Sequence, residues 1–392
     1  MAPALKRSLA KSRELALMLA ASRGDPTREA VKALMAGPLD WERLARLAAD
    51  SHATPGVWAV VSAFPNLPPE ASTLQRLAVV NDFRRYHIRN LVARVVRVLR
   101  EHDIEIIVLK GAALLVGGVA RPVARTMSDI DVLVVKGSPE DAWNACRADG
   151  WSLVDPAWDE ELYRSHHHLP PLVDPDGVEI GLEVHRTLLP GVELVGVDTA
   201  GFLSRARPVM IGDVAVVVPS PEDLLLHDCL HFAWSNKLHR GAWRAFADAH
   251  TIIGDPAFRW DGFLALVTSI RAKMCCYWAL RLARTLADLP VPDEVLRALD
   301  PSSGGAFAAL LERHFVRQVL DADAEGALSE MARRWFWYRA MRGRGSSGST
   351  LEPWSVGDVQ FPDAGLPARV PRGPVRAAMS SFTYLVRLVT GG

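Results

Sequence analysis

Two aspartates separated by one residue are the feature of this sequence that points most directly to chemistry. Asp129 and Asp131 flank Ile130 at the start of a short β-branched run. Because side chains alternate along a strand, both carboxylates would point to one face and Ile130 to the core. Their Cα atoms would lie about 6.6 Å apart, since a strand rises about 3.3 Å per residue. Two carboxylates at this separation can converge on a pair of divalent metal ions.

A third carboxylate is expected on a neighbouring strand. Residues 178–185 alternate apolar and polar side chains, and the Pro-Asp-Gly sequence at 175–177 marks a turn before them. Together with residues 169–173 they predict an antiparallel hairpin. Glu183 lies on the polar face of the second strand, beside His185, which could orient it. We therefore take Glu183 as the third candidate metal ligand.

A phosphate-binding turn is predicted shortly before the aspartates. Residues 104–109 predict a buried strand that leads into Lys110 and Gly111, and residues 112–116 predict a helix. The free N–H groups and the positive dipole end of such a helix attract phosphate, and glycine permits close backbone approach. Lys110 and Arg125 are cations that could bind triphosphate or pyrophosphate oxygens.

These motifs resemble those of a known family. The segments LKGAAL at 109–114, DIDVLV at 129–134 and EVH at 183–185, with Arg125, look like the uncharacterised nucleotidyltransferase family of the DNA polymerase β-like superfamily. The helical leader, the segment from Pro221 to His231 and the one from Trp243 to Ile253 also match its general layout. The resemblance covers about residues 10–300 and leaves residues 340–392 outside.

The resemblance implies an α+β fold, in which a polymerase β-like mixed sheet is flanked by N-terminal and C-terminal helical regions. It implies transfer of NMP from a nucleoside triphosphate, with release of pyrophosphate. Two Mg²⁺ ions, or Mn²⁺ in their place, would be held by Asp129, Asp131 and Glu183. The residues assigned to nucleotide binding are Lys110, Gly111, Ala112, Arg125 and Ser128.

The acceptor is not specified by the resemblance. It could be a hydroxyl, phosphate or amine on a small molecule, a sugar, a peptide or protein, or an RNA end. Gly111-Ala112 stands where the superfamily usually has Gly-Gly or Gly-Ser, and the gap from Ala112 to Asp129 is longer than usual. This departure favours an alternative hypothesis, a catalytically weak nucleotide-binding or scaffold protein on the same fold.

Histidines supply further candidates. His166, His167 and His168 predict either a metal site with His185, acceptor contacts, or a polar strand start without chemistry. His227 and His231 are four residues apart and would share one helix face. A metal-dependent hydrolase built on histidines is therefore a third hypothesis. The residues assigned to a substrate pocket are His168, His185, His231 and Asp248.

The elements that must position these residues fall into four regions. They are a helical region at 1–100, a nucleotidyltransferase core at 101–219 with a single sheet, a helical domain at 220–340, and a Gly/Ser/Pro-rich linker with a terminal helix at 341–392. Apolar spacing predicts helices at 39–49, 74–99, 140–150, 221–234, 241–253, 260–287, 305–340 and 374–389. A further strand is predicted at 214–218.

Composition sets limits on partners and compartment. The 392 residues carry 45 basic and 45 acidic side chains, so zero net charge gives no general attraction to a membrane or to long nucleic acids. No stretch is long and apolar enough to predict a spanning helix, and no secretory signal is recognisable. The four cysteines form neither a disulfide framework nor a CxxC pattern. We expect a cytoplasmic protein without a membrane partner.

Overall fold

A computed structural model gives the fold of the chain. It describes residues 12–23, 28–117, 125–155, 163–164, 166–189, 198–239, 241–270, 273–300, 305–320, 328, 330–342 and 384. Apart from residues 341, 342 and 384, the predicted C-terminal region at 341–392 lies outside the described residues, as does nearly all of the helix predicted at 374–389.

The N-terminal region is helical, and two of its helices start at side-chain caps. It comprises α2 (Arg13–Ser22), α3 (Arg28–Met35), α4 (Trp41–Asp50), α5 (Thr54–Val61), the 3₁₀ turn η1 (Pro69–Ala71) and α6 (Ser72–Glu101). The side chains of Ser12 and Asp40 accept hydrogen bonds from the first turns of α2 and α4, which satisfies N–H groups that have no helical partner. The helices predicted at 39–49 and 74–99 are thereby confirmed.

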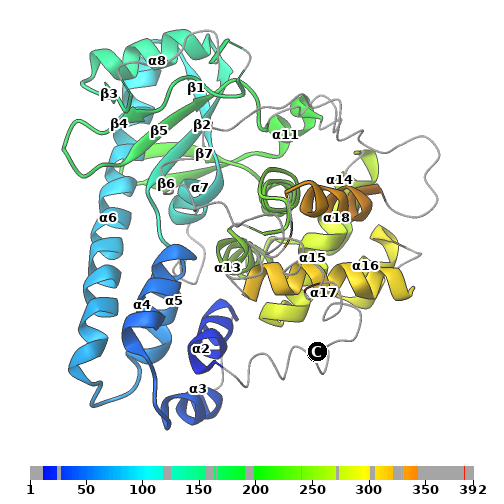
Figure 1. Ribbon diagram of the computed structural model, residues 1–392. Helices are drawn as coiled ribbons and strands as arrows, with labels where there is room; N and C mark the ends of the chain where they lie inside the picture. Colours follow the sequence, from blue (N-terminus) through cyan, green and yellow to red (C-terminus); the bar gives the residue numbers. More distant parts are fainter. Residues whose placement is uncertain are drawn as a thin grey trace.

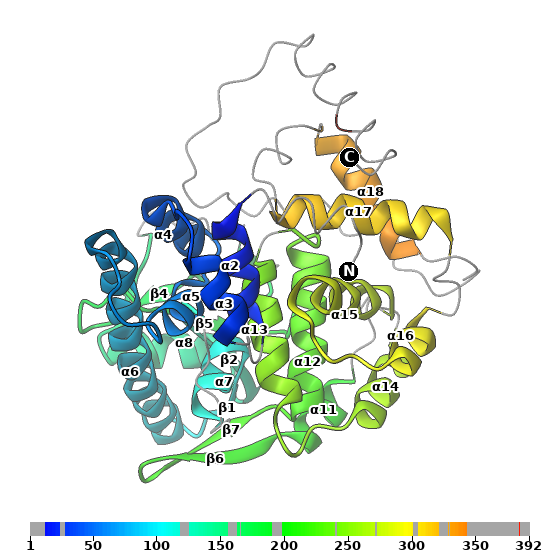
Figure 2. The same cartoon turned by 90° about the horizontal axis from the view of Figure 1, so that it is seen from below.

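Helix α6 connects this region to the sheet. It is 30 residues long and buries a face that includes Leu91, Val95 and Leu99. In Figure 1 it runs along one side of the molecule, past α4 and α5 and then past the sheet, and it contacts α8 (Pro139–Ala148). The helices of the C-terminal region lie on the side of the molecule opposite to α6 (Figure 2).

A mixed five-stranded sheet forms the centre of the fold. Its strands, in spatial order, are β1 (Glu105–Val108), β2 (Asp129–Lys136), β5 (Gly181–His185), β4 (Leu172–Val173) and β3 (Ser152–Leu153). Only the β2–β5 pair is parallel. The chain passes from β1 to β2 through α7 (Lys110–Val116) and segment 117–128. The α+β class is confirmed.

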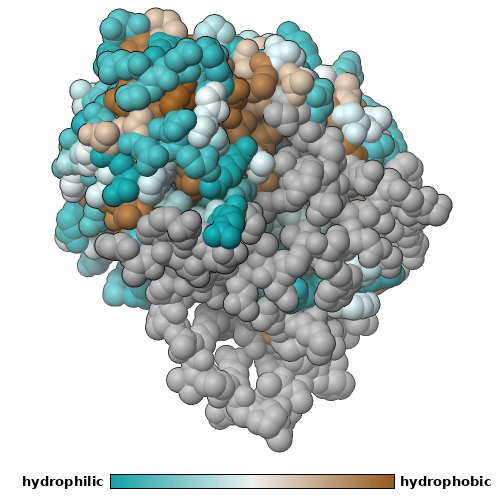
Figure 3. Space-filling view, turned by 90° about the horizontal axis from the view of Figure 1, so that it is seen from above, coloured by the Kyte–Doolittle hydropathy of each residue, from teal (hydrophilic) through white to brown (hydrophobic). Residues whose placement is uncertain are grey.

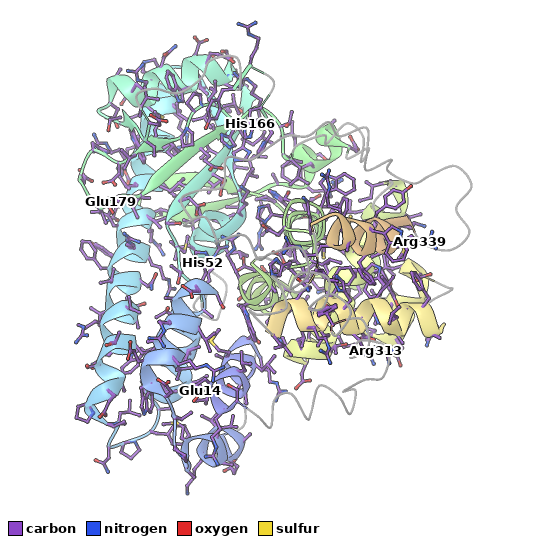
Figure 4. All side chains as sticks on the ribbon, viewed as in Figure 1. Glu14, His52, His166, Glu179, Arg313 and Arg339 are labelled. Carbon is purple, nitrogen blue, oxygen red and sulfur yellow. The ribbon has the colours of Figure 1, made fainter. Side chains whose placement is uncertain are left out.

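The predicted hairpin is confirmed in a shorter form. Leu172 pairs with Leu182, and the Asp174 carboxylate accepts hydrogen bonds from three backbone N–H groups of the turn, those of Asp176, Val178 and Ile180. Glu179 has a positive φ of 63° and lies at the outer edge of the molecule in Figure 4, so the strand begins only at Gly181.

The prediction of a single sheet for residues 101–219 was wrong. The strand at 214–218, β7 (Val214–Val218), pairs with β6 (Arg207–Ile211) in a separate two-stranded sheet that contacts β1. Ile211 pairs with Val214 across Gly212 and Asp213, and Gly212 adopts a positive φ of 60°. A two-residue turn closes the shortest possible loop, so local pairing prevails over joining the larger sheet.

Apart from β6 and β7, the regular elements described from residue 199 onward are helices. They are α11 (Thr199–Arg205), α12 (Pro221–Leu230), the π-helical turn η2 (His231–Ser235), α13 (Ala242–Ile253), α14 (Trp260–Ser269), α15 (Lys273–Ala287), α16 (Asp293–Leu299), α17 (Ala306–Leu320) and α18 (Glu330–Arg342). Ser220 caps α12, because its side chain accepts a hydrogen bond from the N–H of Asp223. No helix of the described residues is long and apolar enough to cross a membrane.

Two predicted helices are divided. The helix expected at 260–287 is split into α14 and α15, because Ile270 adopts an extended conformation that buries its side chain. The helix expected at 305–340 is split into α17 and α18.

From above, the described surface is mostly hydrophilic with smaller hydrophobic areas, as is usual for a face in contact with water (Figure 3).

His314 on α17 gives the fold a testable pH dependence. Its ring is 1% exposed, stacks on Phe336 with ring centroids 4.2 Å apart, and forms a 2.9 Å hydrogen bond between Nδ1 and the Tyr384 hydroxyl. Burial, helped by His239 and Arg333, lowers the pKa of His314 from its ordinary 6.5 to about 3. The unfolded chain therefore binds the proton first, and stability falls as the pH drops below about 6.5.

Proton uptake by His314 in the unfolded chain should lower the free energy of unfolding by about 1.4 kcal/mol when the pH falls from 7.5 to 5.5. Urea denaturation at both pH values should show this loss in the wild type and a correspondingly smaller loss in His314→Asn, whose amide cannot titrate. The exposed His102→Asn variant serves as the control. Equal pH dependence in wild type and His314→Asn would contradict the assignment.

Candidate active site

The parallel register of β2 and β5 brings the acidic residues together. Asp131 is the pairing partner of Glu183, and Asp129 is the partner of Gly181. All three carboxylates line one cavity of about 250 Å³. The side chains alternate as predicted, because Ile130 is fully buried in the core while its two neighbours face the cavity.

Lys110 lies among the carboxylates. Its Nζ atom is 2.6 Å from Asp131 Oδ1 and 3.8 Å from Glu183 Oε2. Lys110 is the first residue of α7 and has a positive φ of 47°, a conformation that typically costs about 1–3 kcal/mol in a residue with a side chain. The backbone N–H of Leu109 donates to the Asp131 carbonyl at 2.8 Å, which fixes the turn against β2.

His185 is a second cation at the base of the cluster. Its Nε2 is 3.0 Å from Asp131 Oδ1 and 3.4 Å from Glu183 Oε2, while Nδ1 donates to the Thr187 carbonyl. Both ring nitrogens thus act as donors. Burial opposes protonation, but the hydrogen bonds to the two carboxylates outweigh it and raise the pKa of His185. The ring lies behind the carboxylates, outside the cavity wall.

The aspartates differ in protonation behaviour because their neighbours differ. Burial alone would raise the pKa of Asp131, but Lys110 and His185 outweigh it and hold the pKa well below its usual range. The pKa of Asp129 is raised by burial and by the negative charges of Asp131 and Glu183. At neutral pH Asp131 is therefore a fixed negative charge. The ionised form of Asp129 is the one that an added cation would stabilise most.

Arg125 packs directly on Gly111. A Cβ atom at residue 111 would lie 2.6 Å from Nη1 and 2.7 Å from Cζ of Arg125, so only glycine leaves room for the guanidinium. Arg125 Nη1 donates to Asp248 Oδ2 at 2.6 Å, and both side chains are buried. Gly111 was expected to let phosphate approach the backbone closely. In the described structure the group that approaches Gly111 is the guanidinium of Arg125.

The helical region supplies the opposite wall of the cavity. Helix α12 contributes Asp228, and α13 contributes Arg244 and Asp248. Burial, together with the charge of Asp248, raises the pKa of Asp228 well above its usual range. Among the described residues no hydrogen bond or ion pair to the side-chain carboxyl group of Asp228 is found, so this group faces the cavity ready to contact a bound molecule.

Most of the residues predicted for the site meet in this cavity. The wall includes Lys110, Arg125, Asp129, Asp131, Glu183, His168, His231 and Asp248. Ala112 is 1% exposed in the core, and Ser128 is exposed and uses its carbonyl to accept from Gly181 N–H. Neither is part of the cavity wall, and Gly111 lies beneath Arg125.

Two charged wall residues were missed from the sequence. Asp228 and Arg244 line the cavity without having been assigned to the site, and so does His227, which the sequence had only paired with His231. Arg244 and Asp248 are four residues apart on α13, and His227 and His231 show the same spacing on α12 and η2. Such spacing places two side chains on one helix face but does not show what that face packs against.

The three consecutive histidines form a compact cluster next to the carboxylates. His168 and His185 form an isolated β-bridge, and His167 and His168 belong to the cavity wall. Burial, together with the charge of His168, lowers the pKa of His166 to about 4. Burial also lowers the pKa of His168. His185 is bound to Asp131 and Glu183, so of the alternatives left open by the sequence, a metal site that joins His185 to the triplet is not formed.

The donor set of the cavity suits hard divalent cations. Asp131 and Glu183 have carboxylate oxygens within 4.8 Å of one another, and Asp129 lines the same space. Mg²⁺ prefers carboxylate oxygen, water and substrate phosphate as ligands. The Lys110 ammonium group, between Asp131 and Glu183, shows that these two carboxylates already bind one positive charge together.

Comparison with known proteins agrees with this geometry. A family model described as an uncharacterised nucleotidyltransferase matches residues 37–288, which include every carboxylate of the cavity. No curated protein and no solved structure matches the chain. The match lies within the expected residues 10–300 and leaves out 340–392. The chain belongs to this family of uncharacterised nucleotidyltransferases.

Proposed function

We propose that the protein transfers a nucleoside monophosphate from an NTP to an acceptor in a Mg²⁺-dependent reaction, on a polymerase β-like fold. One observation carries the proposal. The parallel β2–β5 pairing places Asp131 opposite Glu183, with Asp129 on the same wall and Lys110 between the carboxylates. Three acids converging beside cations suit the binding of a metal–triphosphate complex.

Asp129, Asp131 and Glu183 would hold the metal ions. Bound there, the ions would activate the attacking acceptor group and neutralise charge on the triphosphate and departing pyrophosphate. Asp131 is suited to this role because it stays ionised at neutral pH. Metal binding would also displace Lys110 from Asp131, and the freed ammonium group would then be able to bind phosphate oxygen.

Arg125 would bind the phosphates from the other side. Asp248 and Gly111 fix its guanidinium in one place, so little conformational entropy would be lost on binding. Arg244 adds a further positive charge to the cavity wall. The helical wall would take the acceptor, since Asp228 and Asp248 can accept hydrogen bonds from a hydroxyl or amine.

The second candidate function is nucleotide binding without efficient turnover. It is favoured by the position of Arg125, which fills the space above Gly111 where a phosphate would approach the backbone. The two functions separate in one experiment, because a binding protein would retain Mg²⁺-dependent NTP affinity without releasing pyrophosphate. A screen of each NTP with hydroxyl, amine and phosphate acceptors should detect pyrophosphate if the transferase proposal is correct.

Asp129→Asn tests the metal-binding role. We expect pyrophosphate release to fall at least about 100-fold, because the variant loses a metal-ligating charge but keeps the side-chain shape. The melting temperature should stay the same or rise, since neutralising Asp129 relieves repulsion from Asp131 and Glu183. The exposed Asp261→Asn on α14 is the matched control. A fully active Asp129→Asn enzyme would refute the assignment.

Gly111→Ala tests the placement of Arg125. The added Cβ would displace the guanidinium without removing any charge. We expect the dissociation constant for Mg·ATP, measured by equilibrium dialysis, to increase about 10-fold, since hydrogen bonds to charged groups contribute roughly 1.5–3 kcal/mol. Gly262→Ala on α14 is the control for a general glycine effect. Unchanged affinity in a folded Gly111→Ala variant would show that Arg125 does not bind phosphate.

A further inference from the structure

Three consecutive histidine rings lie close together at the edge of the active-site cavity. The ring centroids of His166, His167 and His168 lie 4.2–4.6 Å from one another. Each ring offers a nitrogen, and these nitrogens lie within 4.8 Å of one another. Imidazole nitrogens that bind one tetrahedral Zn²⁺ at about 2.1 Å lie about 3.4 Å apart, so rings this close together need to reorient to place three nitrogens on one ion.

The backbone of this segment is held in place from two sides. Arg186 Nη1 donates to the carbonyl oxygens of Tyr163, His166 and His168 at 3.1–3.4 Å, and Glu140 fixes the same guanidinium at 2.7 Å. The backbone N–H of Arg186 also donates to the His167 carbonyl at 2.8 Å. The three rings are therefore presented by a preorganised segment, as a specific metal site requires.

His168 also has the hydrogen bond that is typical of a metal-binding imidazole. A carbonyl oxygen can only accept, so the 2.6 Å contact between His168 Nδ1 and the Leu169 carbonyl places the proton on Nδ1. The lone pair is then on Nε2, which is 3.9 Å from Glu183 Oε2. Donation to a backbone carbonyl fixes the ring and strengthens the other nitrogen as a ligand.

We propose that His166, His167 and His168 form a binding site for one Zn²⁺ ion, separate from the carboxylates that would hold Mg²⁺. The donor types distinguish the two sites, because imidazole nitrogen suits zinc and carboxylate oxygen suits magnesium. The zinc ion would fix the segment against β5 and place positive charge at the edge of the cavity. Figure 4 shows His166 beside the sheet, on the side that faces α11.

Zinc stoichiometry tests the proposal directly and does not depend on catalytic activity. The full chain is freed of metal with a chelator, incubated with one equivalent of Zn²⁺ in the presence of millimolar Mg²⁺, desalted and measured by elemental analysis. We expect one zinc per chain, and in a parallel experiment a visible Co²⁺ spectrum with nitrogen ligands. A wild-type protein that retains no zinc would overturn the proposal.

Substitutions at His166 identify the ligands, because this residue is outside the cavity wall. His166→Ala should lose the zinc and keep its circular dichroism spectrum, whereas His166→Cys should keep it and add a thiolate-to-cobalt charge-transfer band. The exposed His102→Ala and the active-site Asp129→Asn should both retain zinc. Zinc that survives His166→Ala but is lost in Asp129→Asn would assign the ion to the carboxylates and refute the histidine site.

Discussion

The parallel pairing of β2 with β5 is the constraint on which the rest of the site depends. It sets Asp131 opposite Glu183 and brings Asp129 to the same wall. Like charges 4 Å apart repel by about 4 kcal/mol at an effective dielectric constant near 20. Lys110 and His185 offset this repulsion by ion pairs to both Asp131 and Glu183. A one-residue slip of β5 would turn Glu183 into the core and destroy the cluster.

An ion pair ties the helical region to the site. Asp248 on α13 binds Arg125, which lies four residues before the first aspartate of β2 and rests on Gly111 at the start of α7. This contact ties three elements to one cavity. It also explains why residue 111 is glycine, since a larger residue would clash with Arg125. The place of Gly111 in a phosphate-binding turn did not suggest this explanation.

Features set by local spacing were predictable. The alternation around Ile130, the hairpin turn at 175–177 and the serine cap at Ser220 each follow from interactions within a few residues, and the structure contains all three. The separate β6–β7 sheet and the division of α14 from α15 were not predicted. The two-residue turn at 212–213 paired β6 with β7 in a sheet of their own. The burial of Ile270 in an extended conformation ended α14, although the hydrophobic periodicity continues.

The sequence by itself determined the acidic residues, the Lys-Gly turn and the family, because a strand alternates with period two and the motif residues are close along the chain. Tertiary structure decided which helix faces that cavity, and so added Asp228 and Arg244 to its wall. It also decided that Arg125 contacts Asp248, 123 residues away. Helical spacing defines a face, but only packing between distant segments decides what that face meets.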